Sequence, residues 1–189
     1  MNIFMCVWLL AASPLFTERH SGKSYDETRL VTREQIECLT DAARWAPSSH
    51  NDQPWMYIVC DRSTHPQAYQ KALSCLKDRQ MVWASKAPLI VLVAFRTHLT
   101  RNGKFNPYAQ YDTGASAISM ALQASDLGFM AHQIGGFEKE KARALFALPD
   151  KYMPMTMMVI GYEAENPLPH ERTRRPLEES FFFGGLHGN

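Results

Sequence analysis

The hydrophobic pattern predicts alternating helices and strands from Thr32 onward. Thr32 and Gln35 have the spacing of a capping box, and apolar residues recur after them at helical spacing, so a helix is expected over 33–46. Further helices are expected over 66–77, 111–128 and 138–147, and strands over 55–60, 87–95, 129–134 and 153–162. This alternation indicates a sheet between helical layers.

Two of these segments have distinctive compositions. APLIVLVAF (87–95) is continuously apolar, which is typical of a strand buried on both faces. The helix YDTGASAISMALQASDLG (111–128) is rich in small residues and ends with Gly128 as its C′ residue. Small side chains let a second backbone approach this helix closely.

The first eighteen residues form a hydrophobic segment whose role the sequence leaves open. The stretch IFMCVWLLAASPLF is too short to span a bilayer comfortably but is similar to the apolar region of a signal peptide. No Lys or Arg precedes it, and cleavage there would leave almost nothing before Arg19. A first helix that packs on a partner subunit explains the segment equally well. Residues 19–189 contain no repeat and no composition break, and we expect a single domain.

The overall charge excludes some partners. The net charge is +1, so no global field favours nucleic acid or an anionic membrane, and any anion site must come from local clusters of basic residues. The four cysteines show no CxxC pairing, the histidines lack metal-ligand spacing, and we expect no metal site. There is no GxGxxG, GxxxxGK[ST] or GxSxG motif. We expect a cytoplasmic protein with reduced, mostly buried cysteines.

Four short polar or glycine-rich clusters are candidates for a binding site. RHSGKSYD (19–26) suits a phosphate, through Arg19, Ser21 and Lys23, although a solvated loop would look the same. APSSHNDQPW (46–55) offers side-chain amides that suit a heterocycle edge, or simple turn chemistry. RTRRP (172–176) is a second basic cluster or a soluble tail. IGGF (134–137) permits close backbone approach to a ligand.

Taken together, these clusters resemble the nitroreductase family of FMN-dependent oxidoreductases. The matching segments run in family order and cover nearly the whole chain after residue 18: RHSGKSYD, AARWAPSSHNDQPWMYIV (42–59), the 112–129 helix, HQIGGF (132–137), VIGY (159–162) and RTRRPLEE (172–179). The resemblance implies an α+β fold with a mixed central sheet. It also implies a homodimer with FMN at the interface, where the 111–128 helix would pack.

The resemblance also implies roles for individual residues. Arg19, Ser21 and Lys23, with His20 between them, correspond to contacts to the phosphate and pyrimidine side of FMN. Pro47, Ser48, Ser49 and Asn51 correspond to the loop that approaches the flavin ring, usually from the partner subunit. Gly135 and Gly136 correspond to backbone donors near the ring, and Arg172 and Arg174 to a phosphate clamp. Flavin carries the chemistry, so no side chain is expected to act as a catalytic group.

The implied activity is reduction of nitroaromatic, quinone or similar acceptors with NAD(P)H, in ping-pong fashion. A specialised relative such as a dehalogenase, a flavin-modifying enzyme or a biosynthetic dehydrogenase is an alternative, as is a flavin-binding protein without turnover. The segment 98–112 is too short for a long lid, so a relatively open site is expected, with Phe105, Tyr108 and 181–183 as candidate lining residues, unless these aromatic side chains serve packing.

Overall fold

The computed structural model describes residues 12–167, 169 and 171–186. Its centre is a four-stranded sheet in the order β1-β2-β4-β3. The strands are β1 (Trp55–Asp61), β2 (Leu89–Arg96), β3 (Met130–Ile134) and β4 (Tyr152–Gly161). The helices are α2 (Pro14–Glu18), α3 (Arg33–Arg44), α4 (Pro66–Ser74), α5 (Asp78–Ala84), α6 (Ala109–Asp126) and α7 (Lys139–Leu145), with short 3-10 turns η1 (Ser49–Asn51) and η2 (Leu177–Glu179).

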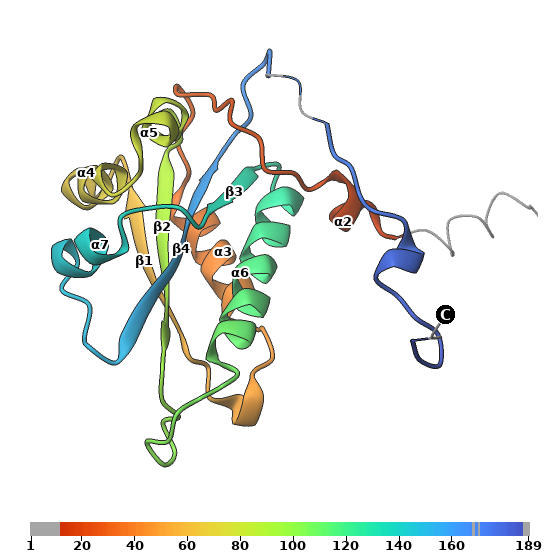
Figure 1. Cartoon of the computed structure of the whole chain (residues 1–189). Coiled ribbons are helices and arrows are strands. Elements are labelled where there is room, and N and C mark those ends of the chain that lie inside the picture. Colours follow the sequence, from red (N-terminus) through yellow and green to blue (C-terminus); the bar gives the residue numbers. More distant parts are fainter. Residues whose placement is uncertain (1–11, 168, 170, 187–189) are drawn as a thin grey trace, which may run out of the picture.

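Helices cover both faces of the sheet, as the apolar pattern of β2 predicts. On one face α3 and α6 pack on side chains such as Val91 and Ile160, and on the other α4, α5 and α7 pack on side chains such as Ile90 and Val159 (Figure 1). Successive residues of β2 and β4 therefore enter different cores, which is why neither strand needs polar positions. The predicted α+β class and the sheet between helical layers are confirmed.

The prediction of a mixed sheet is wrong for the strands described. All three pairings, β1 with β2, β2 with β4 and β4 with β3, are antiparallel. The crossover through α6 does connect two strands of the same direction, β2 and β3, but β4 lies between them and runs the opposite way. Alternation of helices and strands in the sequence cannot reveal this insertion.

Two local features modify the predicted elements. The predicted helix 66–77 ends at Ser74, and α5 follows as a separate short helix that the sequence pattern did not indicate. In β4, Pro154 pairs with Ala94 while Thr156 pairs with Val93, so Met155 forms a bulge. A proline has no N–H for the ladder, and a bulge accommodates it within a buried strand.

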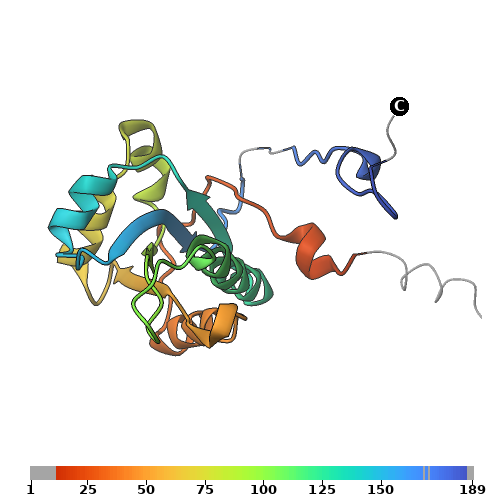
Figure 2. The ribbon, with the colours of Figure 1, turned by 60° about the horizontal axis from the view of Figure 1, so that its bottom comes forward.

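The two ends of the described chain leave the body of the protein together. Figures 1 and 2 both show α2 and the segment after residue 171 side by side, away from the sheet. Arg172 donates a hydrogen bond from Nη1 to the carbonyl oxygen of Thr17, which ties the two segments to each other. Most of the predicted hydrophobic segment, residues 1–11, lies outside the described residues.

Candidate functional site

The segment after α2 is fixed in place by three contacts to the sheet. The Tyr25 hydroxyl donates to the carbonyl oxygen of Val159 at 2.9 Å from a buried position, and burial raises the pKa of this phenol well above its usual range. His132 Nδ1 donates to the carbonyl oxygen of Gly22 at 2.9 Å. Gly22 itself has no room for a side chain, because a Cβ there would overlap the sulfur of Met130. The backbone of residues 19–25 is therefore held rigidly beside β3.

This segment presents basic and hydroxyl groups to a cavity of about 360 Å³. Arg19 and Ser21 line it, with Arg19 Nη1 donating to Ser21 Oγ at 3.4 Å. Arg174 reaches the same cavity from the C-terminal segment. The other lining residues are apolar or carry an amide: Phe16, Ile118, Leu122, Ala131 and Gln133. The lining thus combines groups that suit an anion with apolar surface that suits a flat ring.

Three guanidinium groups converge here. Partial burial, and then the nearby positive charges of Arg172 and Arg174, lower the pKa of Arg19. Among the residues that the structure describes, no carboxylate forms an ion pair with any of the three. Such crowding of like charges costs stability, and a bound phosphate would relieve it.

Cavity volume alone would not identify this site. A cavity of about 340 Å³ between α3 and β1 is also partly apolar, with Val31, Ile36 and Val59 in its walls, but Glu37 and Asp61 are acidic. Arg33 also lines that cavity but is paired with Glu37, so the cavity offers an anionic ligand less free positive charge than the cavity of Arg19. The charge distribution, rather than size, separates the two.

Two predicted residues of the first cluster face elsewhere. His20 lines a smaller cavity on the other side of the segment, where its Nε2 lies 3.0 Å from Glu163 Oε1. Lys23 is exposed and lines none of these cavities, although its charge and that of Arg19 add to the effect of burial in lowering the pKa of His132. The structure thus brings Arg19, Ser21 and Arg174 together, with Arg172 beside them, and leaves His20 and Lys23 at the margin.

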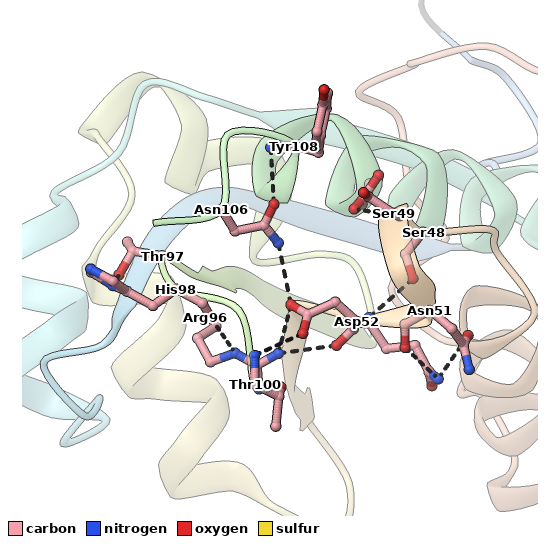
Figure 3. A network of polar contacts seen from close by, with 12 residues as sticks. Ser48, Ser49, Asn51, Asp52, Arg96, Thr97, His98, Thr100, Asn106 and Tyr108 are labelled. Atoms are coloured by element: carbon pink, nitrogen blue, oxygen red, sulfur yellow. Dashed lines mark hydrogen bonds and ion pairs between the residues drawn. The ribbon is translucent and has the colours of Figure 1, made fainter. Parts of the chain in front are cut away.

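The polar loop between Ala46 and Trp55 occupies a separate place, at the first turn of α6. Figure 3 shows its hydrogen bonds. The backbone N–H of Ser49 donates to Asp112 Oδ2 on α6 at 3.0 Å, and the N–H of Gln53 donates to Ser48 Oγ at 3.0 Å. Gln53 Nε2 donates to Asn51 Oδ1 at 3.0 Å. Hydrogen bonds within the turn and to α6 therefore explain part of the loop's polar composition. This agrees with the alternative interpretation of the sequence, in which the polar residues only stabilise the turn.

These hydrogen bonds do not by themselves explain the backbone conformation of this loop. His50, Asn51 and Gln53 have φ values of 55°, 54° and 46°, in the left-handed region that non-glycine residues rarely adopt. Strain of this kind persists where the surroundings fix it, and it concentrates at binding sites. The side-chain NH₂ of Asn51 has no hydrogen-bond partner in the described part of the chain. It remains available to a ligand.

Asp52 holds the strained loop in place and was not identified from the sequence. Its carboxylate, with a side chain only 4% exposed, accepts hydrogen bonds from Arg96 Nη2 at 2.9 Å, from Asn106 Nδ2 at 3.2 Å and from the Thr100 N–H at 2.8 Å (Figure 3). Burial opposes ionisation of Asp52, but the hydrogen bonds from Thr100 and Arg96, with the charge of Arg96, together outweigh it and lower the pKa of Asp52. Because the partners lie more than forty residues away, no local motif could reveal them.

The glycine pair lies where β3 ends. Gly135 and Gly136 are exposed, and a Cβ at either position would meet open space. Two residues earlier, Gln133 already lines the cavity of Arg19. Gln133 belongs to the HQIGGF segment, but only its glycines were assigned a role. Within the described residues there is no group of three or more His, Cys, Asp or Glu side chains that could hold a metal ion.

No helix in the described part of the chain is long and apolar enough to cross a membrane. Cys38, Cys60 and Cys75 are free thiols, the last two buried, as expected for reduced cysteines. Burial raises the pKa of Cys60 to about 12, which makes it chemically inert at neutral pH.

Comparison with known proteins places the chain in a family. The family model described as "Nitroreductase family" matches residues 16–162. A protein of Methanothermobacter thermautotrophicus named "Putative NADH dehydrogenase/NAD(P)H nitroreductase" is 28% identical over 153 residues, which is 79% of this chain and 75% of that protein.

Solved structures agree with this match. A structure described as an oxidoreductase containing FMN has a TM-score of 0.85 at 28% identity, over 95% of this chain and 94% of the other. A nitroreductase family protein of Clostridium difficile 630 has a TM-score of 0.76 at 29% identity, over 94% of this chain and all of the other. The order of polar clusters, the cavity and the family match all agree: this chain belongs to the nitroreductase family.

Proposed function

We propose that this protein is an FMN-dependent oxidoreductase that takes reducing equivalents from NAD(P)H. The observation that carries the proposal is the cavity beside α6, where Arg19, Arg174 and neighbouring Arg172 gather with apolar side chains and form no ion pair with any carboxylate among the described residues. FMN has a phosphate at one end and a flat heterocycle at the other, so it matches both kinds of lining group. The family membership and the FMN-containing structural relative support the same ligand.

The residues present fit FMN by their chemistry. Arg19 and Arg174, with Arg172 beside them, would hold the phosphate, where arginine can bind bidentately, and Ser21 would add a hydroxyl. Ile118, Leu122 and Ala131 would contact the apolar part of the cofactor. Gln133 offers both a donor and an acceptor to a heterocycle edge. We retain Lys23 and His20 as more peripheral contacts on the same segment.

A homodimer would complete the site. Within one protomer, the loop meets α6 at Asp112, whereas the cavity uses Ile118 and Leu122, up to about 15 Å further along the helix at 1.5 Å per residue. If two copies of α6 pack antiparallel about a two-fold axis, the start of one helix lies near the end of the other. The loop of one protomer, with Pro47, Ser48, Ser49 and Asn51, then approaches the cavity of its partner.

The chain's own groups bind, orient and stabilise charge. FMN, when bound, supplies the transfer of a hydride from NAD(P)H to an acceptor. Donors such as the Asn51 NH₂ and the backbone amides of Gly135 and Gly136 would stabilise negative charge on the reduced ring, because fixed dipoles need no reorganisation as charge develops. No side chain is required as nucleophile. We propose nitroaromatics or quinones as acceptors and ping-pong kinetics, since reductant and acceptor would use the same face in turn.

The test is an absorption spectrum of the purified protein before and after anaerobic addition of NADH or NADPH. Oxidised flavin bands that disappear on addition support both the cofactor and the reductant. Flavin bands that persist with either nucleotide would exclude the NAD(P)H step but leave FMN binding intact. A colourless protein that cannot be reconstituted with FMN would overturn the proposal.

A further inference from the structure

We propose that Arg101, held in place by His50, recognises an oxyanion of the molecule that binds on the flavin, either a phosphate of the nucleotide or a carboxylate of the acceptor. The proposal rests on the proposed function, because it assigns a specificity role beside the same loop. Arg101 belongs to the hairpin between β2 and α6, and the sequence analysis gave this arginine no role.

The hairpin is built onto the loop that carries Asn51. His98 and Phe105 form an isolated β-bridge, and the N–H of Leu99 donates to the carbonyl oxygen of Lys104 at 2.8 Å. In its turn, the N–H of Thr100 donates to Asp52 Oδ1 (Figure 3). Because Asp52 belongs to the polar loop, the hairpin and the loop keep one relative position.

Arg101 reaches from this hairpin to the loop. Its Nη2 lies 3.1 Å from Nε2 of His50, and since a guanidinium only donates, the imidazole nitrogen accepts. His50 stands between Ser49 and Asn51 with its backbone at φ 55°, so a strained residue of the loop orients the arginine. The contact uses one of five N–H donors, and the rest of the guanidinium can bind an oxyanion bidentately.

The local charge is uncompensated. Residues 97–108 contain Arg101 and Lys104 but no Asp or Glu. The one acid of the loop, Asp52, is paired with Arg96, and Asp112 accepts the N–H of Ser49. Within the described residues, no carboxylate forms an ion pair with Arg101, which is exposed. An exposed guanidinium that is oriented but unpaired suits recognition of a ligand rather than stabilisation of the fold.

The experiment compares Arg101→Gln with the wild-type holoenzyme. Dissociation constants are measured by calorimetry for NADP⁺, NAD⁺, 4-nitrobenzoate and the neutral 4-nitrobenzamide, and kcat/KM is measured for NADPH, NADH and both nitro compounds. Loss of a charge-assisted contact should weaken at least one anionic ligand about tenfold or more, while 4-nitrobenzamide changes less than about twofold. Arg79→Gln, an exposed arginine on α5, is the matched control and should change none of these values.

The pattern of losses identifies the source of the oxyanion. A loss confined to NADP⁺ indicates the 2′-phosphate, a loss shared by NADP⁺ and NAD⁺ indicates the pyrophosphate, and a loss confined to 4-nitrobenzoate indicates the acceptor carboxylate. His50→Gln, which keeps an acceptor for Arg101, should retain most of the affinity, and His50→Ala should lose more of it. Equal effects on charged and neutral ligands, or no effect, would overturn the assignment. A yellow protein that NADH still reduces would leave the proposed function standing in either case.

Discussion

At the scale of single residues, two neighbouring arginines of the C-terminal segment provide a test of the phosphate site. Arg174 lines the cavity of Arg19, whereas Arg175 points elsewhere, with Nη1 3.8 Å from Glu179. We predict that Arg174→Ala and Arg19→Ala each weaken FMN binding by about 1.5–3 kcal/mol through loss of a charge-assisted contact. Arg175→Ala should bind FMN like the wild type. Fluorescence titration of the apoprotein measures all three, and equal affinity of the two alanine variants at 174 and 175 would refute the site.

Asn51 provides a second test at this scale, because its backbone conformation suits glycine. At φ 54° an alanine would add strain, whereas Asn51→Gly removes only the side-chain amide. We therefore expect the free energy of unfolding of Asn51→Gly to change by less than about 1 kcal/mol. The rate of flavin reduction or the flavin potential should change clearly, as measured by stopped-flow and redox titration. Wild-type redox behaviour in this variant would favour the simple turn interpretation.

At the scale of elements, some features could be predicted and others could not. The capping box is confirmed: Thr32 Oγ1 accepts the Gln35 N–H at 3.2 Å, and Gln35 Oε1 accepts the Thr32 N–H at 2.9 Å. Such signals are local, and so are apolar strands and glycine-rich turns. The left-handed backbone conformations at residues 50, 51 and 53 could not be predicted, because none of these residues is a glycine. The hydrogen bonds that anchor Asp52 could not be predicted either, because their donors are distant in the sequence and only the fold brings them close.

The element-scale prediction concerns this anchoring. Asp52→Asn leaves Arg96, whose side chain is 15% exposed, without its counter-ion, and we expect a loss of about 1–3 kcal/mol in unfolding free energy with weaker FMN binding. Asp41→Asn is the matched control, because Asp41 pairs with Arg44 on the surface of α3, where such pairs contribute less than about 1 kcal/mol. Urea denaturation compares the two. A similar small loss in both variants would show that Asp52 does not hold the loop.

At the scale of the whole molecule, exposed apolar side chains bear on the predicted homodimer. Tyr111 and Ile118 on the outer side of α6 are exposed, and so are Phe181, Phe182 and Phe183 on the C-terminal segment that extends from the body (Figures 1 and 2). Exposed apolar side chains that gather on one face can mark an interface. The small residues of α6 favoured this helix as the packing surface of a homodimer, which stays a prediction. A second chain would cover that surface, and no single-chain pattern specifies such a partner.

Gly114 allows this assembly to be tested through α6. Nothing lies within 4 Å of a Cβ built at Gly114, so in an isolated protomer a side chain can start from this position without an immediate clash. If α6 packs closely against a second copy, Gly114→Arg instead places a bulky charge in the interface. We predict that the wild type sediments at twice its 21.5 kDa chain mass, and that Gly114→Arg sediments as a folded monomer with little bound FMN. Val82→Arg, at an apolar position 73% exposed on α5, should remain a yellow dimer.

Two outcomes would contradict this prediction. A Gly114→Arg protein that stays dimeric would show that another surface joins the subunits. A monomeric wild type that retains FMN would show that one chain alone completes the site.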